Sequence, residues 1–453
     1  MKYAKDYGFL PENDGLANAK ALQEAVKEGG DIYIDLPGTY LLADQVLLYD
    51  DTNLFFCAGS YIKREENPEE TAYVFVNEGA YTHTYNKNIK IQGLNLICNG
   101  VVREDITPES KKIISGLNGH ICFFYAKNIV IEDFQCLDLP SRCFGIHICT
   151  FENAVIERVR IEGKKDAVHF GYGSKFVIRH GLFKTFDDPI ALNAHDYTGS
   201  NPQMGWIENG LIEDCYDIDD DSTDGYFCRI LAGSWPKWYE GIKVQRSDSV
   251  FVNGRLYRVN MPVDGKIYTS VTPPCHESGL AEYDGIWWVA VQDEEYYDCG
   301  CRNIHFKDIY LQKKRPTAFS IHFDKDNWSR SYYPNTDAPV QENLIFENVV
   351  VENDNIPELL YSRTPVDNVK FINCTLKDGA INLKHIETEG IVYPETNILF
   401  SGTMFKDDID TFITCDEGLK ANVTFANTMN KTFKTKVKGD VNVKSTDIEI
   451  VKE

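Results

Sequence analysis

The pattern that most constrains this chain is a strand motif that repeats after about 22 residues. Between residues 163 and 197, apolar residues alternate with polar ones, as in a strand with one buried face. A shift of about 22 residues places Val168 on Ile190, and the same shift places Asp166 on Asp188. Such a repeat predicts coils stacked one on another, with carboxylates from neighbouring coils side by side.

Similar strand patterns recur along most of the chain, and many of them open with asparagine. A lone coil cannot bury its apolar face, whereas stacked coils share one core, so we predict an all-β parallel β-helix rather than a sandwich or propeller. Where the spacing stretches to 40 residues or more, we expect extra coils or loops that form a cleft. The repeats span residues 88–96, 128–137, 153–161, 175–183, 206–215, 250–259, 303–311, 343–351, 368–376 and 397–405.

The two ends of the chain read as caps of one β-helix domain that spans residues 1–453. Within residues 1–45, apolar residues from Ala19 to Val26 have helical spacing, and Gly29-Gly30 stops the predicted helix. A cap would cover the apolar side chains and strand edges at the open end of a solenoid. Residues 421–453 hold fewer apolar side chains and are predicted to form a capping strand or a frayed tail.

The N-terminal segment resembles the cap of the pectate-lyase-like right-handed β-helix superfamily. In that superfamily an Asp-Gly segment and an Ala-rich helix precede a strand that ends in a Pro-Gly-Thr-Tyr turn. Asp14-Gly15 and residues 37–40 match these features. The resemblance implies that the predicted β-helix is right-handed, with a short capping helix at its N-terminal end.

Charge and composition exclude several classes of partner. The net charge of −23 disfavours nucleic acid and anionic membranes, and no apolar run approaches the roughly 18 residues of a membrane span. The N-terminus lacks an apolar signal core, so we expect a cytoplasmic protein, or a secreted one if a leader has been removed. The 13 cysteines lack paired spacing, so buried thiols are expected rather than disulfides or zinc. No metal or cofactor is predicted.

The aspartates of the central repeats are the candidate catalytic residues. Glycoside hydrolysis needs one carboxyl to protonate the leaving oxygen and another to activate water or attack the sugar. Asp166, Asp187 and Asp188 offer three carboxyls on neighbouring coils, and close carboxylates raise one another's pKa. Adjacent residues of a strand point to opposite faces, so Asp187 and Asp188 can share one cleft only if the turn at residues 183–186 bends the chain.

These segments resemble family 28 glycoside hydrolases, the polygalacturonases and their relatives. That family carries Asn-Thr-Asp-Gly, then Gly-Asp-Asp one coil later. Asp166 matches the first aspartate, although Lys164-Lys165 replace Asn-Thr, and Asp187 and Asp188 match the pair, with Phe186 replacing Gly. The resemblance implies inverting hydrolysis, with one aspartate of the pair as general acid and the other two positioning or activating water.

The later family motifs match less well. Gly-His-Gly is absent after the pair, and residues 229–231 match Arg-Ile-Lys without its lysine. Lys243 and Arg246 lie nearby and could replace that lysine in binding a uronate. Arg229 and Lys243 are therefore candidate substrate-binding residues, while galacturonate itself is not specified.

Further candidates for substrate binding come from strand parity and from aromatic residues. His195 and Asn193 alternate with apolar neighbours, as does His169, so all three are predicted to face out of the solenoid toward the aspartates. Residues 187–195 also resemble segments of family 110 galactosidases. Trp235 and Trp238 suit stacking on sugar rings, the alternative being packing of a long loop.

Three other stretches have less specific interpretations. The aspartates of residues 217–224 resemble a calcium loop in composition but lack the EF-hand glycine and glutamate, which favours a solvated loop. The stretches 273–288 and 319–333 are predicted either to line the cleft or to contact a neighbouring subunit.

The leading prediction is a glycoside hydrolase that acts on a carbohydrate. A polysaccharide lyase on the same fold would need a basic residue, which Lys243 or Arg229 could supply. A non-catalytic glycan-binding β-helix, as in phage tails, is the third possibility. The sequence does not specify the oligomeric state.

Overall fold

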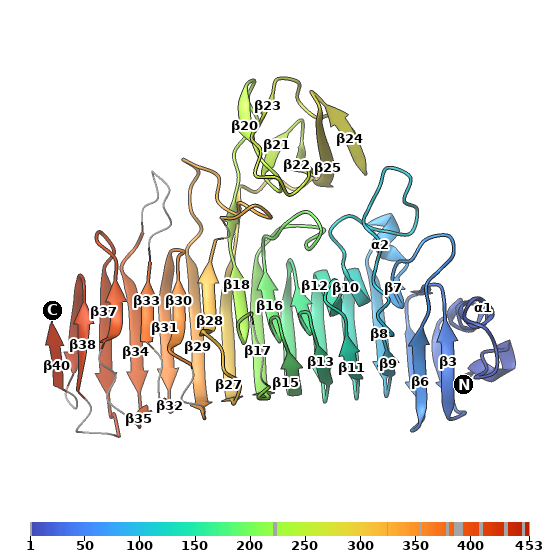
Figure 1. Cartoon of the computed structure of the whole chain (residues 1–453), viewed down its shortest axis with the longest axis horizontal. Helices are drawn as coiled ribbons and strands as arrows, with labels where there is room; N and C mark the ends of the chain where they lie inside the picture. Colours follow the sequence, from blue (N-terminus) through green and yellow to red (C-terminus); the bar gives the residue numbers. More distant parts are fainter. Residues whose placement is uncertain are drawn as a thin grey trace.

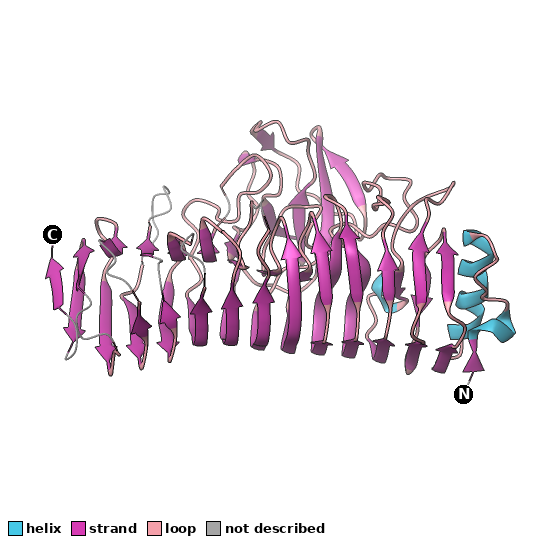
Figure 2. Cartoon of the chain, turned by 60° about the horizontal axis from the view of Figure 1, so that its bottom comes forward, coloured by secondary structure: helices cyan, strands magenta, loops and turns pink. Residues whose placement is uncertain are grey.

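A computed structural model describes residues 2–220, 224–323, 325–352, 356–376, 380–384, 393–406, 411–429, 434–445 and 449–452. The chain is almost all-β and winds into a right-handed parallel β-helix, in which each strand pairs with its equivalents one coil earlier and one coil later (Figure 1). The fold class predicted from the repeats is confirmed. The termini lie at opposite ends of the solenoid (Figure 2).

Register confirms the repeat of about 22 residues. Strand β14 (Val168–Phe170) pairs in parallel with β16 (Ile190–Asn193), with Val168 opposite Ile190 and Phe170 opposite Leu192. The first half of the solenoid is built from β1 (Lys2–Tyr3), β2 (Gly30–Ile34), β3 (Gly38–Leu42), β4 (Val46–Leu48), β5 (Thr52–Phe56), β6 (Ser60–Arg64), β7 (Phe75–Asn77), β8 (Asn86–Gln92), β9 (Asn95–Ile97), β10 (Gly119–Glu132), β11 (Gln135–Leu139), β12 (Phe144–Glu157), β13 (Arg160–Gly163), β15 (Gly173–Thr185), β17 (Ile207–Asp217) and β18 (Cys228–Leu231).

The second half continues the same pairing toward the C-terminus. It is built from β27 (Cys301–Leu311), β28 (Thr317–His322), β29 (Gln341–Val351), β30 (Glu358–Ser362), β31 (Val366–Ile372), β32 (Thr375–Leu376), β33 (Ala380–Leu383), β34 (Thr396–Ser401), β35 (Met404–Phe405), β36 (Thr411–Cys415), β37 (Ala421–Ala426), β38 (Lys434–Lys438), β39 (Val441–Ser445) and β40 (Glu449–Lys452). Most of the described part of residues 421–453 is therefore strand.

The repeated asparagines have a conformational reason. Asn128 and Asn153 open their repeats with φ of 55° and 66°, in the left-handed region that asparagine tolerates better than most residues. The Asn153 side chain donates to that of Asn128 at 2.9 Å, and Asn128 donates to Asn88 at 2.9 Å. Each turn is thus linked to the next along the outside of the solenoid.

The predicted cap is present at the N-terminal end. Helix α1 (Gly15–Val26) begins at Asp14, whose side chain accepts the Ala17 N–H at 2.8 Å. Its apolar face, including Leu22 and Val26, is buried against the first coil. The other helices are short: η1 (Ala4–Tyr7) and α2 (Gly79–Thr82).

The chain leaves the solenoid between β18 and β27 and forms a projecting unit above it (Figure 1). This corrects the prediction of a coil at residues 250–259, because β21 and β22 form an antiparallel hairpin there. Asn253 and Gly254 at its tip have φ of 53° and 77°, as a two-residue hairpin turn requires. The unit comprises β19 (Gly233–Ser234), β20 (Ile242–Val244), β21 (Ser249–Val252), β22 (Arg255–Val259), β23 (Tyr268–Ser270), β24 (Leu280–Tyr283), β25 (Ile286–Gln292) and β26 (Asp298–Cys299).

Two further sequence expectations concern helices and cysteines. Among the described residues, no helix is long and apolar enough to cross a membrane. All 13 cysteines are free thiols, and all except Cys57 and Cys275 are buried. Their predicted burial is therefore confirmed for most of the set.

Equivalent side chains of successive coils stack inside the core. Phe346 stacks on Phe306 at a centroid distance of 5.0 Å and on Phe371 at 4.8 Å. These distances match the spacing of roughly 4.7–4.9 Å between paired strands. The stack therefore repeats with the pitch of the coils, and each ring fills the space left by its neighbours.

We predict that Phe346→Ala lowers the free energy of unfolding by about 3–5 kcal/mol. The substitution leaves a cavity, and the neighbouring coils cannot move in to fill it because the strand pairing fixes their spacing. Urea unfolding followed by circular dichroism measures the change. Leu182→Ala, at an exposed position of β15, serves as the control with little effect. A loss below about 1 kcal/mol for Phe346→Ala would contradict the stacked core.

Candidate functional site

A cavity of about 990 Å³ lies between the central coils of the solenoid and the projecting unit. The coils contribute Lys165 and Arg229, and the projecting unit contributes Met261 and Trp287. Trp328, from the stretch 319–333, lines the cavity as well, so that one of the two predictions for this stretch is confirmed.

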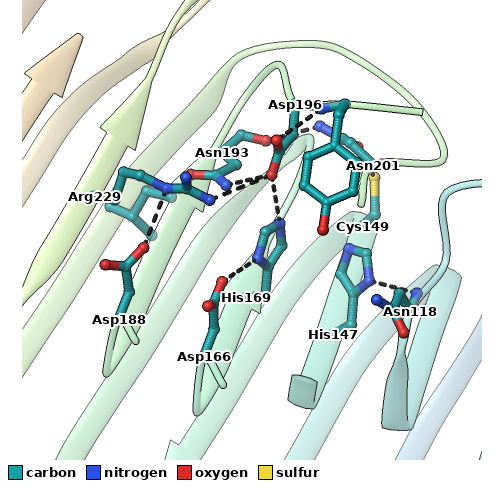
Figure 3. A network of polar contacts seen from close by, with 12 residues as sticks. Asn118, His147, Cys149, Asp166, His169, Asp188, Asn193, Asp196, Asn201 and Arg229 are labelled. Atoms are coloured by element: carbon teal, nitrogen blue, oxygen red, sulfur yellow. Dashed lines mark hydrogen bonds and ion pairs between the residues drawn. The ribbon is translucent and has the colours of Figure 1, made fainter. Parts of the chain in front are cut away.

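The three predicted catalytic aspartates come together beside this cavity. Each offers a carboxylate oxygen within 4.8 Å of the other two. Asp166 and Asp188 occupy equivalent positions of neighbouring coils, where the Ala167 N–H donates to the Asp188 carbonyl at 3.1 Å. Figure 3 shows both side chains rising from adjacent coils toward the same group of residues.

Asp187 joins them because the chain bends after β15. It lies in the turn rather than in a strand, and the Thr185 hydroxyl donates to the Asp187 carbonyl at 2.8 Å. The bend that the sequence required for a shared site is therefore present. The Asp187 side chain is 27% exposed, whereas those of Asp166 and Asp188 are 0% and 1% exposed.

Two cations form ion pairs with the carboxylates. Lys165 forms an ion pair with Asp187, and its Nζ lies 3.2 Å from Asp166 Oδ1. Burial lowers the pKa of Lys165, but the two aspartates more than offset this, so its pKa is raised. Arg229 Nε lies 3.1 Å from Asp188 Oδ2. Arg229, predicted to bind substrate, is thus engaged by a carboxylate of the cluster.

His169 lies beside Asp166, as its parity predicted. Its Nδ1 is 2.9 Å from Asp166 Oδ2, and its ring stacks on Phe144 at 4.1 Å. Burial, with the nearby Arg229 and Lys165, lowers the pKa of His169 well below its usual value. The neutral ring therefore donates its Nδ1–H to Asp166 and fixes that carboxylate.

A loop after β16 completes the network from above (Figure 3). Asn193 Nδ2 donates to Asp196 Oδ2 at 2.6 Å, and the same oxygen lies 3.5 Å from an Arg229 nitrogen. Arg258, on β22, is fully buried and donates to the Asp196 carbonyl at 3.2 Å. The projecting unit thereby anchors a loop that contacts the aspartate site.

The charges of this network do not balance. Burial raises the pKa of Asp188 well above its usual value, and burial together with Asp166 raises that of Asp187 against the opposing pull of Lys165 and Arg229. A cluster with more carboxylates than cations favours retention of a proton at neutral pH. Four carboxylates share two cations in this network: Asp166, Asp187, Asp188 and Asp196 with Lys165 and Arg229.

A buried ion pair supports the turn from the next coils. Arg315 binds both carboxylate oxygens of Asp217, at 2.6 and 3.0 Å, and donates to the Thr185 carbonyl at 3.3 Å. Lys313 donates to the same carbonyl at 2.8 Å. Asp217 is fully buried, so the prediction of a solvated loop at residues 217–224 is wrong at this position; Asp221 lies outside the described residues.

Six of the seven predicted substrate-binding residues do not line the cavity; His169 and Asn193 belong to the aspartate network, and the other four lie elsewhere. Trp235 is 1% exposed, packs into the core and donates to the Tyr296 carbonyl at 2.8 Å. Trp238 packs within the projecting unit, and Lys243 is exposed on β20, where its Nζ lies 2.5 Å from a threonine hydroxyl. His195 is buried, with its ring 6.2 Å from that of Trp235. Parity placed His195 outside the solenoid, but the projecting unit covers that face.

Sequence reasoning missed several residues of the site. Lys165 was visible only as a departure from the family pattern, and Asp196 follows His195 directly without a motif of its own. The exposed aromatic face of the cavity is Trp328, which is 52% exposed, rather than Trp235. Its signal was its position in a widened interval among other polar and aromatic residues.

Comparison with known proteins finds the same fold among solved structures. No family model and no curated protein matches the chain. The solved family 28 exopolygalacturonase of Yersinia enterocolitica matches with a TM-score of 0.50 and 13% identity, over 98% of this chain and 77% of that one. The hyperthermoactive exopolygalacturonase of Thermotoga maritima matches with a TM-score of 0.51 and 12% identity, over 99% of this chain and 91% of that one.

The chain has the fold of these enzymes. The resemblance inferred from the cap and the aspartates is thereby confirmed at the level of the fold. At this identity the comparison shows the β-helix alone, so the reaction has to be argued from the site.

We predict that Asp188→Asn raises the melting temperature at neutral pH. The pKa of Asp188 is raised in the fold, so its ionisation costs stability progressively as the pH rises above the unfolded value of about 3.9. Asparagine can still accept the Tyr226 N–H, which Asp188 accepts at 2.7 Å, but carries no charge. Thermal unfolding across the pH range should show a gain that shrinks toward about pH 4.

The matched control is Asp31→Asn, which neutralises an exposed aspartate on β2 and should leave the melting temperature unchanged. A lower melting temperature for Asp188→Asn at neutral pH would contradict the charge surplus of the site.

Proposed function

We propose that this protein hydrolyses a glycosidic bond in an oligosaccharide or polysaccharide. The observation that carries the proposal is the convergence of Asp166, Asp187 and Asp188 within 4.8 Å beside a cavity of about 990 Å³. A pair of carboxyls in different protonation states is what this reaction requires. The fold shared with two exopolygalacturonases supports a carbohydrate substrate.

Asp187 acts as the general acid. Its carboxyl is the most exposed of the three and its pKa is raised, so it can hold a proton and reach a leaving oxygen. Asp166 and Asp188 are buried and held by donors, His169 for the first and the Tyr226 N–H for the second. They are suited to orient a water molecule.

This assignment favours inversion at the anomeric carbon. A nucleophile must reach the sugar directly, and the buried positions of Asp166 and Asp188 make such contact difficult. The alternative is retention, which the oxygen spacing within 4.8 Å would suit better, because retaining enzymes place the two carboxyls roughly 5–5.5 Å apart and inverting ones roughly 6.5–9.5 Å apart. Proton NMR of the first product formed distinguishes the two: the opposite anomer supports these three roles, and the same anomer would make an aspartate the nucleophile.

The cavity supplies a binding surface for a sugar ring. Trp328 is half exposed, and its ring lies 5.7 Å from that of Tyr197 and 5.8 Å from the Arg246 guanidinium. An aromatic face of this kind packs against the apolar C–H face of a sugar. The volume is at the upper end of the range of about 300–1,000 Å³ for ligand pockets, which suits more than one sugar unit.

The geometry disfavours a lyase. A lyase needs a base that removes a proton next to a carboxylate. Lys165 and Arg229 each lie between carboxylates, and the raised pKa of Lys165 keeps it protonated. A glycan-binding protein without activity is the other alternative, and an assay of products separates it from an enzyme.

We predict that the wild type releases reducing ends from a panel of neutral and uronic oligosaccharides without the ultraviolet absorbance of an unsaturated sugar. Asp187→Asn should lower kcat by roughly 10²–10⁴-fold, because the proton donor is lost. The matched control is Asp214→Asn, at an exposed aspartate that pairs with His180 on the outer surface. Absorbance would indicate a lyase, and binding without products would indicate a binding module.

We also predict that Lys165→Met moves the alkaline limb of the pH profile of kcat/KM to higher pH. Lys165 opposes protonation of Asp187, so its removal raises the pKa of that carboxyl and keeps the acid form to a higher pH. Initial rates measured across the pH range test this. An alkaline limb that stays in place or moves to lower pH would contradict Asp187 as the acid.

A further inference from the structure

We infer that the cavity holds a second binding subsite, centred on Arg103, for an anionic substituent of the glycan. This inference rests on the proposed function, since it concerns the same cavity, and it adds the chemistry of a sugar unit away from the bond that is cleaved. Arg103 lies in the segment between β9 and β10 and lines the cavity.

Arg103 is buried and hydrogen-bonded on one side but is not neutralised. It is only 7% exposed, and its Nε lies 3.4 Å from Asn118 Oδ1. The other end of that amide donates to the Arg142 carbonyl at 3.1 Å, which fixes the orientation of Asn118. Its Nη1 is buried and has no hydrogen-bond partner in the described part of the chain.

Of the other basic residues that line this cavity, Arg246 likewise forms no ion pair with a described residue but donates to the Met261 carbonyl, and the remaining three are paired. Lys165 and Arg229 each lie between two carboxylates, and Arg142 pairs with Asp105 at 3.1 Å. Arg103 forms no ion pair with any described residue. A buried cation without a counter-charge is costly, so an anionic group of a ligand would supply the partner that the protein does not.

The position of Arg103 separates this subsite from the aspartates. Asn118 directly precedes β10, which pairs with β12, and β12 pairs with β14, the strand that follows Asp166. Asn118 is thus two coils away from Asp166, on the order of 10 Å at the usual strand spacing. The bound anion would therefore belong to a sugar next to the one that reacts.

The link between the two places is direct. The backbone N–H of Asn118 donates to His147 Nδ1 at 3.0 Å, and the His147 ring lies 4.8 Å from that of His169 (Figure 3). The residues around Arg103 and those around Asp166 are thus packed against one another and form one continuous surface. A glycan in the cavity could contact both without a change in the coils.

The group that fits is a compact monoanion on a sugar. A uronate carboxylate and a sulfate ester both accept hydrogen bonds from a guanidinium, and charge-assisted bonds of this type are the stronger ones. A neutral sugar or a methyl-esterified uronate offers no such charge. The subsite therefore selects a negatively charged sugar over a neutral one. The binding experiment below distinguishes a uronate from a sulfate ester.

Binding is measured by titration calorimetry in an Asp187→Asn background, so that no substrate is consumed. The probes are a uronic acid disaccharide, its methyl ester and a sulfated neutral disaccharide. We expect Arg103→Gln to weaken binding of one charged disaccharide by about tenfold or more and to leave the methyl ester unaffected. Whichever charged probe shows the loss identifies the substituent.

Arg142→Gln is the matched control, because it removes one positive charge from the same cavity at a residue already paired with Asp105. Arg103→Lys should restore part of the affinity, and unchanged melting temperatures show that the variants fold. Equal binding by Arg103→Gln and its parent, equal losses for charged and neutral probes, or no preference for charged probes in the parent would each overturn the subsite.

The binding experiment tests the subsite separately from the proposed reaction. Hydrolysis by the wild type with no effect of Arg103→Gln on binding would overturn the subsite alone. Charge-dependent binding through Arg103 without hydrolysis by the wild type would overturn the proposed reaction and leave the subsite in place.

Discussion

The parallel pairing of each coil with the next is the constraint on which the rest of this structure depends. It places equivalent residues of successive coils about 4.8 Å apart, whatever their chemistry. Inside, this spacing suits stacked phenylalanines such as Phe346 and Phe371. Outside, it suits the hydrogen-bonded asparagines that include Asn128 and Asn153. At the turn that precedes β14 and β16, the same spacing brings together like charges.

A stack of like charges is unfavourable, and the molecule offsets it only in part. Lys165 and Arg229 each contact two carboxylates, while burial raises the pKa of Asp187 and Asp188. Arg315 supports the Thr185 backbone that shapes the turn. The arrangement lowers the stability of the fold but leaves a carboxyl that can donate a proton near neutral pH. Catalytic sites commonly combine lower stability with such a perturbed pKa.

The projecting unit gives the site its walls. Arg258 reaches from β22 to the loop that carries Asp196, and Trp287 lines the cavity from β25. A bare solenoid would present the aspartates on an open face. With the unit in place, they lie beside a cavity in which a cation such as Arg103, which forms no ion pair with a described residue, can select a ligand.

The parts of the fold that follow from local repetition could be predicted from the sequence. The shift that places Val168 on Ile190 could be found in the sequence because equivalent positions of successive coils carry similar residues. The hairpin at Asn253-Gly254 carried a known turn signal but was assigned to a coil because its alternation resembles the repeats. Burial of Trp235 matches the alternative of a packed long loop, whereas burial of His195 could not be predicted, because it depends on an insertion that folds back over the solenoid.

The central claim is that the aspartate cluster keeps a proton because its carboxylates outnumber its cations. Carbon-13 NMR of labelled aspartate carboxyls, followed across the pH range and assigned with Asp187→Asn and Asp188→Asn, measures this directly. The account predicts at least one carboxyl of the cluster that titrates well above the ordinary aspartate value of about 3.9. Titration of the Asp166, Asp187 and Asp188 carboxyls all at or below that value would contradict this claim.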